Sequence, residues 1–152
     1  MLISLVFGSL MIIFNLLIQV LAVVLLVSML IRKINSGSFK PGLIPDAGII
    51  STMLMVLFFG HVLQFSTWAL LFVLLGEFTD FSSAFYHSTV NFTSLGYGDI
   101  VMSERWRLLG GLEAANGVLM FGLTAGTLLS VMTRVFARHI SPDQLKNFKR
   151  HP

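Results

Sequence analysis

Three long apolar runs dominate this chain and restrict what it can fold into. They cover residues 1–31, 47–76 and 108–136, and a helix needs roughly 20 apolar residues to cross a bilayer. Backbone groups in hydrocarbon must be hydrogen-bonded internally, so runs of this length predict helices. Only 11% of the 152 residues are charged, against about a quarter in soluble domains. The runs therefore predict an all-α membrane protein with three transmembrane helices.

The first run has the features of a retained helix rather than a removed signal peptide. No basic residue precedes it, no small-residue cleavage site follows it, and it is about twice the usual apolar length. We expect residues 1–31 to be an N-terminal transmembrane helix. Turn signals such as Pro41-Gly42 then predict a cytoplasmic loop over residues 32–46. A short basic cytoplasmic tail is predicted over residues 137–152.

The basic residues gather at one end of the predicted helices. Three of the ten Lys and Arg residues lie in the first loop and five lie from Arg134 onward. Because cytoplasmic loops carry the excess of Lys and Arg, this end is predicted to be cytoplasmic and the N-terminus to be outside. Glu77, Asp80, Asp99 and Glu104 lie at the other end, where their charge would concentrate cations.

Between the second and third runs, residues 81–93 are too few and too mixed to span the bilayer. Asp80 is a suitable N-cap for a half-length helix, because its carboxylate can accept from free backbone N–H groups. Such a helix would point its negative C-terminal end at the residues that follow it. Non-helical backbone at membrane depth is tolerated only inside protein or beside water. The pattern predicts a re-entrant helix and loop.

The stretch that follows, Thr93 to Asp99, has unusual backbone chemistry. Successive carbonyls of an extended chain point to opposite sides, so lining one axis with all of them requires alternating handedness. A left-handed residue at every second place is cheap only for glycine, and Gly96 and Gly98 have that spacing. Four such segments around an axis would form rings of carbonyl oxygen able to replace the hydration shell of a potassium ion.

These residues also carry a family resemblance. Thr93 to Asp99 resembles the potassium-channel filter signature Thr-Thr-Val-Gly-Tyr-Gly-Asp, with Ser94 for the second Thr and Leu95 for Val. The resemblance implies a passive, potassium-selective channel in a bacterial plasma membrane. One chain has one pore loop and a ring filter needs four, so a homotetramer surrounded by lipid is expected.

The resemblance covers residues 47–136 and divides them into an outer helix (47–76), a pore helix (81–93), a filter (94–98) and an inner helix (108–136). It implies that the ion-binding filter residues are Ser94, Leu95, Gly96, Tyr97 and Gly98, with potassium on the carbonyls of the first four. Thr93 and Asp99 would support the filter, and Tyr97 would brace it against the pore helix. No cofactor is implied beyond the permeant potassium ions.

The pore helix departs from the family where a Trp pair is often found, because Tyr86 and His87 stand there. We predict that Tyr86 contacts Asp99 and that His87 contacts the Tyr97 hydroxyl. Both side chains then serve simply to pack and hydrogen-bond. A sharper hypothesis is that protonation of His87 weakens the filter and makes conduction sensitive to external acid.

The third run resembles the family's inner helix. Gly117 is the predicted hinge, since glycine in a helix eases bending. Gly122 and Gly126 have the spacing of close helix packing. Phe121 and Ala125, one turn apart, are predicted to line the cavity beneath the filter.

Polar residues inside the runs need partners in a membrane. Asn15 and His61 are predicted to lie at similar depth, and Gln19 and Gln64 extend the same patch by a turn. Their hydrogen bonds would hold the first span to the second, the alternative being that His61 senses protons. Glu113 either supports the filter from behind or titrates as a gate, and we expect it to lie near water.

Other function classes fit less well. No nucleophile–base pair, metal cluster or phosphate loop is present, so we predict that the protein is not an enzyme. Such an apolar chain does not predict a nucleic-acid partner, and no small-molecule ligand is evident. The alternatives kept open are a carrier-type transporter subunit, a non-conducting membrane subunit and a less selective cation channel.

Overall fold

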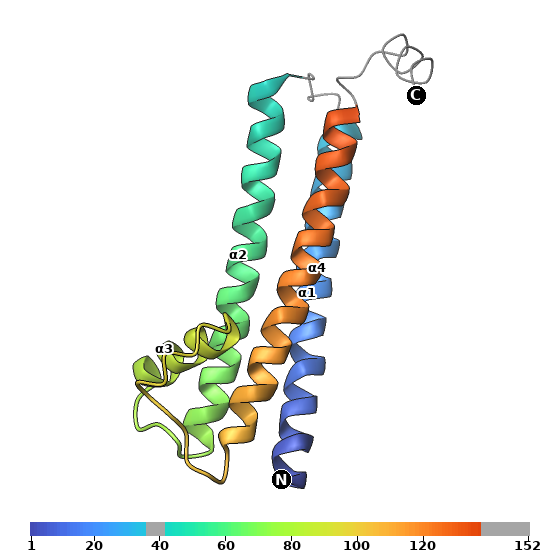
Figure 1. Cartoon of the computed structure of the whole chain (residues 1–152). Helices are drawn as coiled ribbons and strands as arrows, with labels where there is room; N and C mark the ends of the chain where they lie inside the picture. The colour runs from blue at the N-terminus through green and yellow to red at the C-terminus, as the bar shows by residue number, and fades with distance from the viewer. Residues whose placement is uncertain (36–41, 138–152) are drawn as a thin grey trace, which may run out of the picture.

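The computed structural model describes residues 1–35 and 42–137, and four helices make up most of them. The helices are α1 (Leu2–Asn35), α2 (Leu43–Leu74), α3 (Phe81–Phe92) and α4 (Arg107–Ala137). Figure 1 shows the three long helices lying side by side, with α3 packed beside one end of α2. The described residues contain no strand, and α1, α2 and α4 are each long and apolar enough to cross a membrane. The predicted all-α membrane fold is confirmed.

The first two long helices extend beyond their predicted ranges. α1 continues to Asn35 and α2 already begins at Leu43, so the loop predicted over 32–46 is wrong at both ends. Pro45 does not prevent this early start, because the first turn of a helix has no intrahelical partner for the N–H that proline lacks. The predicted tail beyond residue 137 and the middle of the loop, 36–41, lie outside the described residues.

α2 ends two residues earlier than predicted, at Leu74. Gly76 takes a left-handed φ of 75°, and the N–H of Glu77 donates to the Phe72 carbonyl at 3.0 Å. This is a common way to end a helix, because glycine adopts that conformation without cost. The chain then turns into α3, where Asp80 is the N-cap as predicted and accepts from the Ser83 N–H at 2.8 Å.

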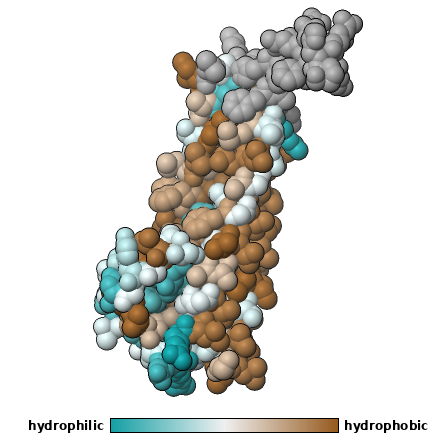
Figure 2. All heavy atoms as spheres, viewed as in Figure 1, coloured by the Kyte–Doolittle hydropathy of each residue, from teal (hydrophilic) through white to brown (hydrophobic). Residues whose placement is uncertain are grey.

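A core cluster fixes α3 against the long helices. Its largest fully buried side chains come from α2, α3 and α4 and are Trp68, Phe72, Phe92, Leu109 and Met120. A smaller apolar cluster joins α1, α2 and α4 at the opposite end of the bundle. Figure 2 shows hydrophobic side chains over the visible faces of the long helices and hydrophilic ones around α3. The fold therefore places α3 firmly and leaves an apolar exterior for lipid or other chains.

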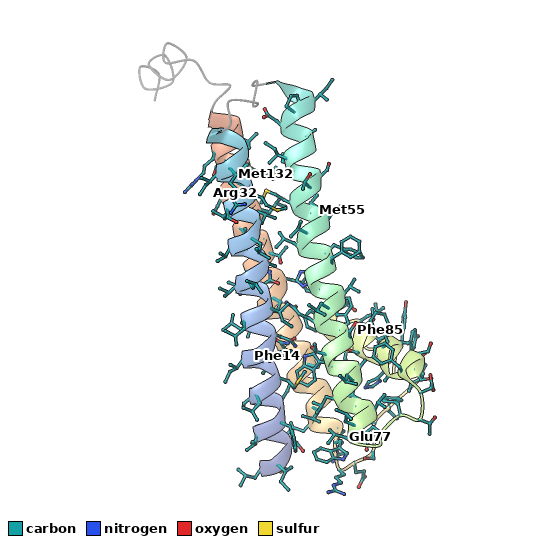
Figure 3. All side chains as sticks on the ribbon, turned by 180° about the vertical axis from the view of Figure 1, so that it is seen from behind. Phe14, Arg32, Met55, Glu77, Phe85 and Met132 are labelled. Atoms are coloured by element: carbon teal, nitrogen blue, oxygen red, sulfur yellow. The ribbon has the colours of Figure 1, made fainter. Side chains whose placement is uncertain are left out.

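The two ends of the bundle differ in the charged residues that they carry. The N-terminus, α3 and the start of α4 lie at one end, and the ends of α1 and α4 lie at the other (Figure 1). Figure 3 shows Arg32 and Glu77 at these opposite ends. The acidic residues near α3 are thus separated from the basic ends by the length of the apolar helices.

Candidate functional site

The segment 94–98 follows the C-terminus of α3 and has an alternating backbone. Positive φ angles occur at Ser94 (58°), Gly96 (60°) and Gly98 (73°). The alternation predicted for the two glycines is present. Ser94 adds a third left-handed residue that the sequence did not predict, at a cost of roughly 1 kcal/mol for a residue with a Cβ. Every second residue from 94 to 98 is therefore left-handed.

The N–H groups at the start of this segment are turned toward α3. Ser94 donates to the Asn91 carbonyl at 2.8 Å, and Leu95 and Gly96 donate to the Val90 carbonyl at 3.0 and 3.4 Å. Within the described part of the chain, the carbonyls of residues 94–97 accept no hydrogen bond. These carbonyls are consequently available as oxygen ligands for a cation, which is the chemistry expected of this segment.

One chain does not cover the segment. Residues 93–99 are all exposed, with Leu95 at 55% and Tyr97 at 67%. The Tyr97 ring therefore does not brace the segment against α3 within one chain, contrary to the expectation. A single chain offers oxygen ligands to an ion from one side only.

The end of the segment is tied to α3 by two hydrogen bonds. The Tyr86 hydroxyl donates to the Asp99 carboxylate at 2.7 Å, as predicted. This bond holds the pKa of Asp99 below its usual value and raises the pKa of Tyr86. One residue further along, the His87 ring bonds through Nδ1 to the Ile100 carbonyl at 3.0 Å. α3 thus fixes two consecutive residues after the segment.

The prediction that His87 meets the Tyr97 hydroxyl is wrong within the chain, because both ring nitrogens have other partners. A carbonyl can only accept, so Nδ1 carries the proton toward Ile100. Nε2 then accepts from the Asn91 amide at 2.8 Å. This arrangement requires a neutral ring. Burial lowers the pKa of His87, and the bond to Ile100 opposes that shift only in part.

Glu113 of α4 lies behind α3, fully buried, so the expectation that it is near water is wrong. α3 covers it, and the Ser88 hydroxyl bonds to its carboxyl. The other carboxyl oxygen, Oε2, is buried and has no hydrogen-bond partner among the described residues. The one hydrogen bond of the carboxyl thus joins α4 to the middle of α3. This burial behind α3 favours a supporting role for Glu113 over the role of a titrating gate.

Gly117 lies directly against the last turn of α3. A Cβ added at Gly117 would overlap the backbone carbonyl of Phe92. The glycine therefore permits close approach of α4 to α3. This packing role was not predicted from the resemblance, which indicated a hinge. The Phe121 ring packs edge-on against Phe92 at 5.8 Å and remains 38% exposed. Ala125 is also exposed, so both predicted cavity residues lie on the surface of the single chain.

Two further contacts were missed by the sequence reasoning. The Glu77 carboxylate accepts from the backbone N–H and the hydroxyl of Ser103 at 2.7 and 2.6 Å. This joins the turn after α2 to the return before α4, and no spacing in the sequence pairs these residues.

In the middle of the bundle, the predicted contact between Gln19 and Gln64 is present at 3.0 Å. Thr124 of α4 joins that patch unexpectedly.

Comparison with known proteins places this geometry in context. A family model described as "Ion channel" matches residues 51–134, which include most of α2, all of α3 and nearly all of α4. The chain is similar to the potassium voltage-gated channel protein Shal of Drosophila melanogaster, with 31% identity over 71 residues. That match covers 46% of this chain and only 12% of the relative. No solved structure matches the chain significantly.

Proposed function

This chain belongs to the ion channel family, and on that premise we propose that it conducts potassium ions passively and selectively. The conducting element is the 94–98 segment of four identical chains, which together form the filter. The protein is an integral membrane protein and not an enzyme.

The observation that carries this proposal is the left-handed backbone at Ser94, Gly96 and Gly98. Alternation turns successive carbonyls to one side, and the N–H groups at the start of the segment are occupied by α3. Four copies would stack carbonyl rings from Ser94, Leu95, Gly96 and Tyr97 around potassium ions. Rings of carbonyls replace the ion's hydration shell, and repulsion between ions in adjacent rings moves them through the filter.

A tetramer is supported by what one chain leaves uncovered. The exposed side chains of Leu95 and Tyr97 belong to a segment that the membrane can accept only inside protein or beside water. A closed ring of identical chains provides both surroundings, and four pore loops give fourfold symmetry. Gly122 and Gly126 are exposed on α4 with open space around them, which suits contact with a second copy.

The path below the filter would be lined by Phe121 and Ala125 and would open by bending of α4 at Gly117. The C-terminal end of α3 leads directly into the filter, so its negative dipole end would favour a dehydrated cation there. The charge distribution supports an orientation with the filter end and the N-terminus outside and the basic C-terminus in the cytoplasm. We propose a bacterial plasma membrane as the location.

Flux through reconstituted protein tests the proposal. Liposomes with a potassium gradient should show a potassium flux that barium blocks and that is absent with sodium. Gly96→Ala should abolish it because the left-handed φ of 60° does not suit alanine. Gly111→Ala is the matched control, since it is exposed and its new Cβ meets nothing within 4 Å.

Three outcomes would contradict the proposal. Potassium flux that survives Gly96→Ala would mean that the filter is assigned wrongly. Equal fluxes of potassium and sodium would indicate a less selective cation channel. Absence of any flux from protein that size measurement shows to be tetrameric would indicate a non-conducting subunit.

A further inference from the structure

Four polar side chains from three helices meet in the middle of the bundle. Gln19 comes from α1, His61 and Gln64 come from α2, and Thr124 comes from α4. The first three are buried, and Thr124 is half-buried. Polar groups at this depth are costly unless they are hydrogen-bonded to one another. Their partners therefore determine how the three helices fit together.

The contacts among these side chains close into a ring. Gln64 Nε2 lies 3.0 Å from Gln19 Oε1, and Gln19 Nε2 lies 2.9 Å from the Thr124 hydroxyl. The same hydroxyl lies 3.0 Å from His61 Nε2. His61 Nδ1 lies 3.2 Å from Gln64 Oε1, which returns to the starting residue.

The directions of the four hydrogen bonds are mutually consistent. Gln64 Oε1 can only accept, so His61 Nδ1 carries the proton and Nε2 of the neutral ring accepts. The Thr124 hydroxyl therefore donates to His61 while it accepts from Gln19. Every member then donates once within the ring and accepts once, and hydrogen bonds in such a chain strengthen one another.

The ring lies where α4 would move. Thr124 is seven residues after Gly117, about two turns along a helix that runs unbroken through both positions. His61 also packs against Phe121, with ring centroids 4.8 Å apart. A bend at Gly117 would carry Thr124 away from Gln19 and His61 and break two bonds of the ring.

α1 is anchored firmly enough to resist that movement. Near its N-terminal end, the Phe7 ring packs edge-on against Trp106 at 6.0 Å. Gly8 lies so close to Leu112 that an added Cβ would overlap its side chain. Both partners lie before Gly117 in the chain, so α1 is fixed to the part of the molecule that would stay still.

We propose that this ring is a latch that holds α4 straight and that α1 is the regulatory arm that completes it. The proposal rests on the proposed channel function and adds a role for the helix that lies outside the family match. The apolar contacts of α4 with α1 and α2 near Val131 and Val135 are non-directional and can slide. The ring's hydrogen bonds require fixed geometry, so they decide when the helix is released.

Single-channel recording of reconstituted protein tests the latch. Thr124→Val and Gln19→Leu should each raise the ratio of open to closed time by about 3- to 15-fold, the range expected for hydrogen bonds between membrane helices. Conductance and potassium selectivity should not change, because the filter is untouched. Thr127→Val is the matched control, since that hydroxyl bonds only to its own helix, at the Leu123 carbonyl.

The double variant distinguishes a latch from a general loss of packing. Gln19 acts on α4 only through Thr124 in this ring, so the double variant should open no more readily than Thr124→Val alone. Fully additive effects would overturn the proposal, as would a Thr124→Val channel that behaves like Thr127→Val.

A measurement without current separates this proposal from the channel function. The chain has no cysteine, so a spin label at Leu129→Cys, an exposed position on α4, reports distances between copies. Thr124→Val should widen the distance distribution and Thr127→Val should not. If the wild-type protein carries no current but Thr124→Val still widens the distances, the channel function alone is contradicted. Unchanged distances in Thr124→Val would overturn the latch.

Discussion

The Tyr86 hydroxyl donates a 2.7 Å hydrogen bond to the Asp99 carboxylate, which joins α3 to the residue that follows the proposed filter. The carboxylate is exposed, and its charge makes the bond stronger than one between neutral groups. Together with the bond from His87 to Ile100, it fixes the direction in which the chain leaves the filter. The shape of the proposed filter therefore depends on α3 at both of its ends.

Removal of the Tyr86 hydroxyl tests this relationship. Tyr86→Phe keeps the ring and loses the bond to Asp99, so we expect steady potassium flux to fall and the tetramer to dissociate at a lower temperature. Asp99→Asn keeps an acceptor for the hydroxyl and should be milder than Asp99→Ala. Flux and thermal dissociation equal to wild type in Tyr86→Phe would show that the contact does not support the filter.

External acid should weaken conduction through His87. Burial lowers the pKa of this ring below its ordinary value of 6.5, so the folded protein holds it neutral and the unfolded chain binds the proton first. Stability is complete above pH 6.5 and falls as pH drops below it. A protonated Nε2 can no longer accept from Asn91. Current through the folded channel should stay constant from about pH 8 to below 6.5 and decline as the pH falls through the lowered pKa of the ring.

The control for that titration is His87→Phe, with each current normalised to its own value at neutral pH. The neighbouring Asp99 does not interfere in this range, because its pKa lies below the usual value for an aspartate. The variant should lose the decline below pH 6.5. The same decline in both proteins would assign it to another group.

Glu113 should tolerate an amide but not an apolar side chain. Glu113→Gln keeps an acceptor for the Ser88 hydroxyl, so flux should remain near wild type. Glu113→Leu removes that acceptor and leaves Ser88 with the Phe65 carbonyl as its partner, so one buried hydrogen bond is lost at a cost of about 1 kcal/mol. We expect reduced tetramer stability and flux, measured by thermal dissociation and liposome assay. A Glu113→Leu protein as stable as Glu113→Gln would contradict the supporting role.

Gly117 should be intolerant of a side chain for a reason separate from hinge bending. Gly117→Ala places a methyl group on the Phe92 carbonyl, and overpacking of this kind costs about 1–3 kcal/mol or more. Thermal dissociation should drop, whereas Gly111→Ala, with open space around it, should match wild type. If Gly117→Ala alters opening without loss of stability, the hinge alone explains the glycine.

The features that the sequence predicted are those in which residue type and spacing have one physical meaning. Three apolar runs of this length predict spanning helices, and paired glycines at 96 and 98 permit the left-handed backbone that is found there. Asn15 and His61 at matching depth predicted polar contact between the first two spans. The Thr67 hydroxyl, which donates to the Asn15 amide at 2.9 Å, is part of that contact.

The features that the sequence did not predict depend on tertiary packing. Ser94 is left-handed because its N–H is held by α3, although serine disfavours that conformation. Thr124 and Thr127 look alike in the sequence, and only the fold decides that Thr124 faces α1. Glu113 lies in the first turns of its helix, and sequence position does not reveal that α3 covers it.

We propose that four copies of residues 94–98 select potassium over sodium. The most direct measurement is the reversal potential of reconstituted channels in a planar bilayer, with potassium on one side and sodium on the other. We expect a large potential of the sign set by potassium leaving its own side. A potential near zero, with current present, would contradict it.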